Sequence, residues 1–315
     1  MSKQIREPLG RLLTNVQQVI KGKNEVVKDA LIGILARGHI LLEDVPGVGK
    51  TTLAHLLARS INLSFSRIQF TSDMMPSDII GVSIYDQREH QFEFKQGPVF
   101  ANIVLADEIN RTSPKTQSAL LEAMNSAQVT MDKQTYNLPQ PFMVIATQNP
   151  IEFHGTYPLP KSQMDRFLLR LSIGYPDLEN EVSILRDQVD VGNIDFVQPV
   201  LSSEEMISMQ HDTARVKIDD DLLHYLARIV AATRNHRLVD LGISTRGALA
   251  LRRAAQARAY IENRDFVVPD DIKDMVVPVF AHRIQVMRSF ETSAIDQTEE
   301  EQVLKQILSE VDVPL

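Results

Sequence analysis

The sequence HILLEDVPGVGKTT, residues 39–52, combines the features from which the architecture of the whole chain can be inferred. Its first five residues form an apolar run that is typical of a buried strand, and from Thr51 onward TTLAHLLARSI has the apolar spacing of a helix. Between them lie Gly47 and Gly49, whose backbones can approach a ligand closely because they lack a Cβ atom. A strand, a glycine-containing turn and a helix in this order predict a phosphate-binding loop.

Each residue type in this loop has a task in holding a nucleoside triphosphate. Backbone N–H groups converge on phosphate oxygens, and the helix N-terminus adds positive potential. We expect Lys50 to reach the β- and γ-phosphates and the Thr51 hydroxyl to bind Mg²⁺. Asp44 replaces the first glycine of the usual GxxxxGK[ST] pattern, and aspartate tolerates unusual backbone angles. The expected nucleotide-binding residues of the loop are Pro46, Gly47, Val48, Gly49, Lys50, Thr51 and Thr52.

A second apolar strand, residues 103–106, ends in two adjacent acids. Asp107 is expected to hold Mg²⁺ through its water shell, because magnesium prefers oxygen ligands and keeps several waters. Glu108 would then lie beside the γ-phosphate and polarise the attacking water. An acid pair at a strand end is often only a solvated turn or a helix cap. Its combination with the phosphate-binding loop favours the roles of metal ligand and base.

A third apolar strand, residues 142–147, leads into Gln148-Asn149-Pro150. In a parallel sheet Asn149 would lie between the two preceding strand ends, where its amide could bind the γ-phosphate and orient the water. The alternative is an asparagine that only turns the chain before Pro150.

Strands and helices alternate through the first part of the chain. Further strands are expected at residues 65–70 and 167–173, and two helices within residues 5–37 precede the first strand. This alternation predicts an α/β fold with a parallel sheet covered by helices on both faces. Two hairpin-like segments, residues 82–94 and 128–138, interrupt it and are expected to project from the surface.

The second part of the chain has helical periodicity almost throughout. Apolar spacing predicts helices at residues 222–233, 245–262, 270–284 and 299–311. We therefore expect an α/β nucleotide-binding core over residues 1–175, a linker over 176–203 and an all-helical domain over 204–315.

The composition excludes several classes of protein. A net charge of −8 and a pI near 5.5 argue against a general nucleic-acid binder, which usually carries a basic excess or a basic face. The absence of cysteine excludes disulfides, thiolate zinc sites and cysteine nucleophiles. The sequence has no apolar run long enough for a membrane span and no signal-peptide pattern at its start, so we expect a cytoplasmic protein.

Several further motifs accompany the loop: LADEINR at residues 105–111, ATQNP at 146–150 and GTYPLPKSQMDRF at 155–167. Together with the two hairpins and the helical tail, they make residues 20–284 or so closely similar to the MoxR family of AAA+ ATPases. This resemblance implies an α/β AAA+ core and a helical lid that bind ATP or ADP with Mg²⁺. It also implies a ring of identical subunits, usually a hexamer, with the nucleotide between neighbours.

The resemblance assigns roles to further residues. Val19 and Ile20 are similar to the segment that contacts adenine, and Asn149 to the residue called sensor 1. Arg166 resembles the arginine finger that is presented to the next subunit's nucleotide. Arg246 resembles sensor 2, a lid arginine that reaches back to the γ-phosphate. An arginine beside the γ-phosphate neutralises developing charge, and supplying it from a neighbour couples hydrolysis to assembly.

Alternatives exist for both arginines. Arg166 could instead pair with Asp165 in a structural ion pair, and Arg111 and Arg170 are rival candidates for the finger. Arg246 could be a charge on a helix face, because Ser244 is a plausible N-cap. The chain departs from the family motif in the segments 153–154 (Phe-His) and 161–162 (Lys-Ser), where acidic residues are common, and this concerns the subunit interface.

The family resemblance implies that hydrolysis drives chaperone-like remodelling, maturation or activation of a protein partner, often one with a von Willebrand factor A domain. A nucleic-acid motor is the first alternative, although neither hairpin offers a basic groove. A nucleotide-gated scaffold with incidental turnover is the second, and the presence of Glu108 and Asn149 argues against it. Whether the hairpins contact a client or a neighbouring subunit is left open by the sequence.

Overall fold

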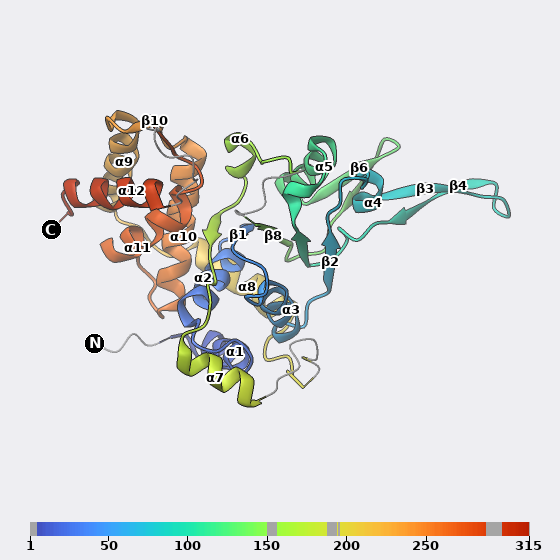
Figure 1. The fold of residues 1–315 in the computed structure, drawn as a ribbon, viewed down its shortest axis with the longest axis horizontal. Coiled ribbons are helices and arrows are strands. Elements are labelled where there is room, and N and C mark those ends of the chain that lie inside the picture. Colours follow the sequence, from blue (N-terminus) through green and yellow to red (C-terminus); the bar gives the residue numbers. More distant parts are fainter. Residues whose placement is uncertain (1–4, 150–155, 188–193, 195, 288–297, 315) are drawn as a thin grey trace.

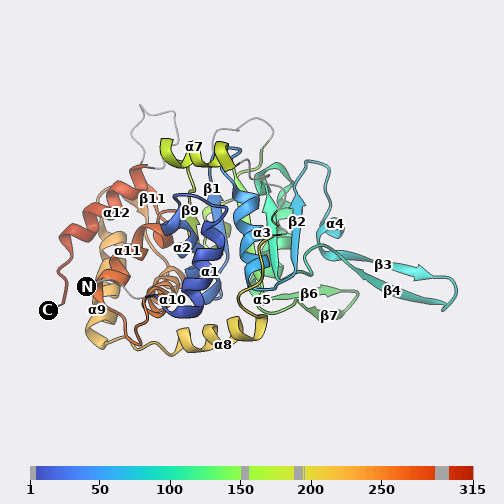
Figure 2. The same ribbon diagram turned by 90° about the horizontal axis from the view of Figure 1, so that it is seen from below.

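The structure, a computed structural model, describes residues 5–149, 156–187, 194, 196–287 and 298–314. Figure 1 shows a central α/β region, a group of helices on one side of it and a long hairpin that projects on the other side. The same arrangement is seen from below in Figure 2.

Five parallel strands form the central sheet in the order β2-β5-β8-β1-β9. Each of these strands lies within or next to an apolar run that predicted it. Strand β8 lies between β1 and β5, so the residue that follows β8 lies between the other two strand ends, as the sequence predicted. The strand bounds are β1 Ile40–Glu43, β2 Phe65–Gln69, β5 Ile103–Asp107, β8 Met143–Gln148 and β9 Leu169–Leu171.

Alternate side chains of the strands enter two different hydrophobic clusters, because successive residues of a strand point to opposite faces. Leu42, Leu105 and Ile145 belong to the cluster that contains helices α1, α2 and α3. Leu41, Val104 and Val144 belong to the cluster that contains residues of α4 and α5. Both faces of the sheet are therefore covered, which confirms the α/β fold. The helix bounds are α1 Glu7–Gln17, α2 Asn24–Leu35, α3 Lys50–Ser60, α4 Pro76–Ile80 and α5 Pro114–Ser126.

Both predicted hairpins are present. The first consists of β3 Gly81–Asp86 and β4 Gln91–Gln96, and the second of β6 Gln128–Met131 and β7 Gln134–Asn137. Phe94 stacks on Tyr136 with ring centroids 4.4 Å apart, so the hairpins contact each other. The β3–β4 hairpin extends away from the body of the protein, and its side chains Ile84 and Phe92 are 50% and 72% exposed.

The second part of the chain is helical, as predicted. Two short strands, β10 Val239–Leu241 and β11 Gln285–Val286, pair with each other among these helices. The same cluster of buried apolar residues extends from the sheet and α1–α3 into this helical region. The helix bounds are α8 Ser203–Ala214, α9 Asp220–Asn235, α10 Thr245–Ile261, α11 Pro269–Phe280 and α12 Thr298–Glu310.

Helix α7, Leu178–Asp187, was not predicted, because it lies in the segment expected to be a linker. Its apolar residues Leu178, Val182 and Leu185 have helical spacing, although Leu178 and Leu185 are 77% and 72% exposed in the structure. A second signal was Asp177, whose side chain accepts a hydrogen bond from the backbone N–H of Asn180 at 2.8 Å, as an N-cap does.

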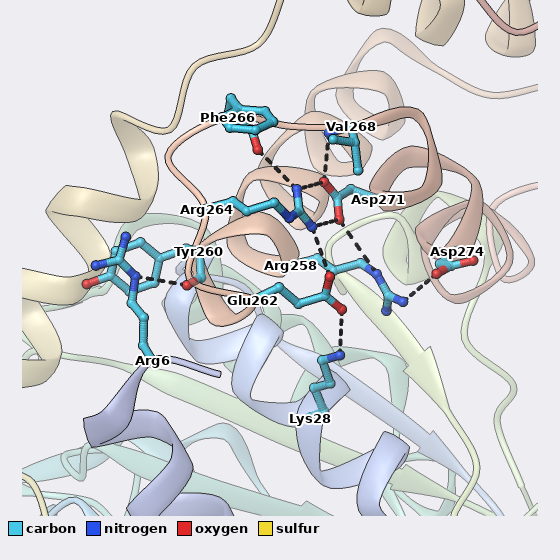
Figure 3. Close-up of polar contacts among 10 residues, drawn as sticks. All are labelled: Arg6, Lys28, Arg258, Tyr260, Glu262, Arg264, Phe266, Val268, Asp271 and Asp274. Atoms are coloured by element: carbon cyan, nitrogen blue, oxygen red, sulfur yellow. Dashed lines mark hydrogen bonds and ion pairs between the residues drawn. The ribbon is translucent and has the colours of Figure 1, made fainter. Parts of the chain in front are cut away.

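A chain of buried charges joins the core to the helical region (Figure 3). Lys28 on α2 donates to Glu262 at 2.8 Å, with side chains 10% and 4% exposed. Arg264 pairs with both Glu262, at 2.9 Å, and Asp271, at 2.6 Å. Arg258 is buried beside the same groups and pairs with Asp274. The alternation of signs means that each buried charge has an opposite partner.

We predict that Lys28→Met lowers the free energy of unfolding by about 3 kcal/mol, because it leaves the buried Glu262 carboxylate with one cation fewer. Lys273→Met is the matched control. The Lys273–Asp270 pair is 3.9 Å long with side chains 35% and 77% exposed, so its loss should cost less than about 1 kcal/mol. Urea unfolding measures both, and equal losses would contradict the importance of the buried pair.

Candidate functional site

The loop between β1 and α3 forms an open cradle. Gly47 and Gly49 have φ angles of 84° and 91°, in the left-handed region that glycine adopts without strain. A Cβ atom placed on either glycine would meet no other atom within 4 Å, so the space over the loop is free for a ligand. Helix α3 begins at Lys50, directly after Gly49, and its N-terminus adds positive potential there. This geometry fits a phosphate group.

The Lys50 side chain folds over the loop. Its Nζ donates to the backbone oxygens of Asp44 at 2.7 Å and of Val45 at 3.2 Å. Partial burial lowers the pKa of Lys50, and the nearby carboxylates of Asp44, Asp107 and Glu108 oppose that change. The cation therefore lies over the cradle, where phosphate oxygens could replace the two carbonyl oxygens as its partners.

The role of Asp44 differs from the expected one. Asp44 is not among the described residues with positive φ, so tolerance of unusual angles does not explain it. Its buried side chain accepts hydrogen bonds from the backbone N–H groups of Ile173 at 2.6 Å, Gly174 at 2.7 Å and Val45 at 2.9 Å. Asp44 thus ties the start of the loop to the segment that follows β9.

A cavity of about 530 Å³ brings the predicted residues together. The loop contributes Lys50 and Thr51, and the ends of β5 and β8 contribute the acid pair and Asn149. Their convergence follows from the order of the strands, since the carboxyl ends of β1, β8 and β5 are neighbours. The lining residues are Pro46, Gly47, Gly49, Lys50, Thr51, Thr52, His55, Arg67, Gln69, Asp107, Glu108, Thr147 and Asn149.

The hydroxyl of Thr147 organises the acid pair, which the sequence did not indicate. It donates to Asp107 Oδ1 at 2.6 Å and accepts from the backbone N–H of Glu108 at 2.9 Å. Glu108 has a φ of 57°, an unusual value for a residue with a side chain. The hydrogen bond from its N–H to Thr147 therefore stabilises a strained backbone conformation. The only available signal was the place of Thr147 two residues before Asn149.

Other side chains from β2 and from the turn after β5 contact the two acids. Arg67 pairs with Asp107 at 2.6 Å, and Gln69 donates to Glu108 at 3.0 Å. Arg111 pairs with Glu108 at 2.7 Å. The negative charges of the pair are therefore balanced by cations within the same chain.

The donor set at this cavity fits Mg²⁺. Thr51 and Asp107 both line the cavity and offer the oxygen ligands that magnesium prefers. Within the described ranges, no group of three or more His, Asp or Glu side chains could hold a metal ion. A site with few protein ligands suits magnesium, which binds through one or two side chains together with substrate phosphates and water.

A second cavity, of about 330 Å³, adjoins the first at the loop. Val19 and Ile20, the expected adenine contacts, line it together with Val48. Gly47 and Gly49 line both cavities, so the loop separates an apolar pocket from a polar one. Helix α7 adds apolar side chains to the pocket that sequence reasoning did not anticipate. A base in the second cavity and phosphates in the first would suit this arrangement.

The two predicted arginines lie elsewhere. Arg166 donates to the backbone oxygen of Leu121 on α5 at 2.6 Å, and Arg246 lies 3.8 Å from Asp165 with its side chain 59% exposed. In the described part of the chain, neither arginine lines these two cavities. Ser244 caps α10 by accepting from Gly247 N–H at 3.1 Å, which places Arg246 in the first turn. Its contact with a γ-phosphate stays a prediction.

The rival finger candidates are bound to acids of their own chain. Arg170 has a side chain only 10% exposed and pairs with Glu43 at 3.5 Å and Glu301 at 2.9 Å. Arg111 is held by Glu108, as described above. The segment 153–154, where the chain departs from the family motif, lies outside the described residues.

Comparisons with known proteins give a consistent result. Residues 39–169 match the family described as ATPase family associated with various cellular activities (AAA), and residues 231–307 match the AAA lid domain. The chain is 47% identical over 307 residues to the uncharacterized protein YeaC of Bacillus subtilis, covering 98% of this chain and 95% of that protein. It is 39% identical over 315 residues to Chaperone MoxR1 of Mycobacterium tuberculosis, covering 97% of this chain and 82% of that protein.

A solved structure of a candidate ATPase from Cytophaga hutchinsonii superposes with a TM-score of 0.89 at 39% identity. The match covers 98% of this chain and 95% of that one. Among the described residues, no helix combines the length and the apolar character that crossing a membrane requires.

We predict that Thr147→Val lowers the turnover number for ATP by about tenfold or more, since a buried Asp107 oxygen and the Glu108 N–H lose a partner. Affinity for ATP, measured by equilibrium binding, should change little because the loop is untouched. Thr135→Val on the exposed part of β7 is the control and should keep normal turnover. Wild-type turnover in Thr147→Val would show that the hydroxyl does not organise the acids.

Proposed function

This chain belongs to the MoxR family of AAA+ ATPases, and we propose that it hydrolyses ATP within a ring of identical subunits to remodel a protein partner. The observation that carries the hydrolytic part is the cavity in which Lys50, Thr51, Asp107, Glu108 and Asn149 converge. These residues supply a cation, a hydroxyl, two carboxylates and an amide around the space expected for the γ-phosphate.

In the proposed reaction the substrate phosphates lie in the cradle of the loop, and Lys50 exchanges its contacts with Asp44 and Val45 for phosphate oxygens. Thr51 and Asp107 would hold Mg²⁺, which neutralises phosphate charge when bound. Glu108 orients and polarises the attacking water. Because Gln69 and Arg111 hold its carboxylate in this structure, Glu108 must exchange these contacts to face the water.

Asn149 has a simpler task in this proposal. It is 8% exposed and lines the same cavity as Glu108, at the end of the strand between β1 and β5. From there its amide can donate to a γ-phosphate oxygen and accept from the water, which fixes the line of attack.

The ring is supported by the position of Arg166, which lies outside the cavities of its own subunit. Burial and the nearby charge of Arg246 both lower the pKa of Arg166, so the two arginines are electrostatic neighbours. Two cations on one surface are favourable when an anion from another molecule lies between them. We propose that this anion is the ATP of the adjacent subunit, with Arg166 as the finger. Arg246, the sensor 2 candidate, would then act on the neighbour's γ-phosphate instead of reaching back to that of its own subunit.

The proposed remodelling of a protein partner is supported by the 39% identity of this chain to a protein named as a chaperone. The exposed apolar side chains of the β3–β4 hairpin are available to a client or to a neighbouring subunit. A nucleic-acid motor gains no support from this hairpin, where Lys95 pairs with Glu93 at 2.6 Å. A von Willebrand factor A-domain client, a hexameric ring and a cytoplasmic location stay predictions from the sequence.

We predict that Glu108→Gln reduces ATP turnover by at least about hundredfold while ATP binding persists, because the amide cannot polarise the water but fills the same space. Single-turnover hydrolysis and equilibrium binding of ATP measure the two effects. Glu310→Gln at the exposed end of α12 is the control. Unchanged turnover in Glu108→Gln would remove this residue from its role.

We predict that Arg166→Ala reduces turnover by at least about hundredfold and leaves ATP binding nearly unchanged, since the finger acts on the neighbour. Wild-type specific activity should rise with protein concentration as the ring assembles. Arg215→Ala, an exposed arginine after α8, should retain activity. If dilute monomeric protein hydrolyses ATP as fast as the assembly, the finger does not act in trans.

A further inference from the structure

The segment that carries Arg166 is held by an arginine of the helical region. Arg283 follows the end of α11 and is 5% exposed. Its Nε donates to Asp165 Oδ1 at 2.8 Å, and its Nη1 donates to the backbone oxygen of Leu168 at 3.1 Å. Its Nη2 donates to the backbone oxygens of Asp165, at 3.3 Å, and of Phe167. Arg283 therefore contacts both chain neighbours of Arg166.

His282 makes a further contact of the same kind. It is fully buried, and its Nε2 lies 3.0 Å from the backbone oxygen of Phe167. Two successive residues of the helical region thus bind carbonyl groups of one short segment. A buried guanidinium needs its donors satisfied, and its planar fork has a fixed geometry. The backbone on both sides of Arg166 is consequently fixed relative to α11.

Arg283 also contacts the turn that carries Arg246. A Cβ atom on Gly247 would lie 3.2 Å from Cδ of Arg283, so the start of α10 packs directly on this side chain. Asp165, which accepts from Arg283, also accepts from Ser244 Oγ at 3.4 Å and lies 3.8 Å from Arg246. Burial lowers the pKa of Arg283 to about 10, so it is charged at neutral pH and needs this carboxylate.

We propose that Arg283 is a positioning residue for the arginine finger: it fixes the backbone of residues 165–168 to the lid, so that the lid of one subunit sets the position of Arg166 at the next subunit's nucleotide. The proposal rests on the proposed trans role of Arg166. In the described part of the chain Arg283 lines neither cavity, so its effect on its own subunit's nucleotide site is indirect.

Arg283→Gln should lower turnover by about hundredfold, the order of loss that a misplaced catalytic group causes, while the affinity for ATP changes by less than about twofold. Mixing with Glu108→Gln separates a trans effect from a cis effect. A Glu108→Gln subunit has an inactive site but an intact finger, whereas an Arg283→Gln subunit has an intact site and a misplaced finger.

Equal amounts of the two inactive variants should therefore form rings that regain turnover at about a quarter of their sites, where an intact Glu108 faces an intact finger. Arg166→Ala mixed with Glu108→Gln is the reference. Recovery in the reference but not with Arg283→Gln would overturn the positioning role and leave the proposed function standing. Recovery in neither mixture would refute the trans finger, and the positioning role would be refuted with it.

Two further variants guard against a folding defect. Asp165→Asn removes the carboxylate that accepts from Arg283 Nε, at a position whose side chain is 19% exposed, and should show a smaller loss with the same recovery on mixing. If Arg283→Gln does not fold, Asp165→Asn replaces it in the mixing experiment. No recovery of turnover with Glu108→Gln would then contradict the proposal. Arg264→Gln, a lid arginine paired with Asp271 far from this segment in the chain, should lower stability but keep turnover per folded subunit. If Arg264→Gln loses as much turnover as Arg283→Gln, the loss comes from a general loosening of the lid, and the positioning role is wrong.

Discussion

The carboxyl ends of three adjacent parallel strands, β1, β8 and β5, must lie at one edge of the sheet, and the whole site depends on this constraint. Glu43 is in register with Gln148, and Ala106 with Ala146, so the residues that follow each strand emerge side by side. The phosphate-binding loop, Asn149 and the acid pair are far apart in sequence, and the order of the strands brings them together at one edge of the sheet. A slip in register would move each polar group to another face and destroy the cavity.

At this edge of the sheet, ion pairs with nearby cations hold the two acidic side chains in place. Two adjacent carboxylates in a partly enclosed cavity are costly unless cations lie near them. Arg67 on β2 and Arg111 after β5 supply two such charges, and the Lys50 cation lies over the loop. A magnesium–nucleotide complex would bring both a cation for the acids and anions for Lys50. Its binding would therefore exchange one set of ion pairs for another instead of creating an uncompensated charge.

The parts of the fold with a periodic or motif signal could be predicted from sequence, and those that depend on tertiary contact could not. Apolar runs identified the strands, and glycines at defined spacing identified the loop. The function of Asp44 was misjudged because its partners, the N–H groups of residues 173–174, follow a strand far along the chain. Thr147 and Arg67 acquire their roles only from the neighbours that sheet order gives them. Helix α7 is a different case, because Leu178, Val182 and Leu185 have helical spacing and the sequence therefore did contain a signal for it.

Strand β9 links the lid helices to the strand that precedes the phosphate-binding loop. It is an edge strand next to β1, and helix α11 of the lid packs against it. Arg170 on β9 pairs with Glu43, the last residue of β1 before the loop, and with Glu301 on α12. Just before β9, the segment that carries Arg166 is bound by Arg283, which follows the end of α11. The lid helices thus contact both the last residue before the phosphate-binding loop and the segment that carries Arg166, the proposed finger. In the proposed ring, a displacement of the lid would bias both sites together, and this is the physical requirement for coupling between neighbouring subunits.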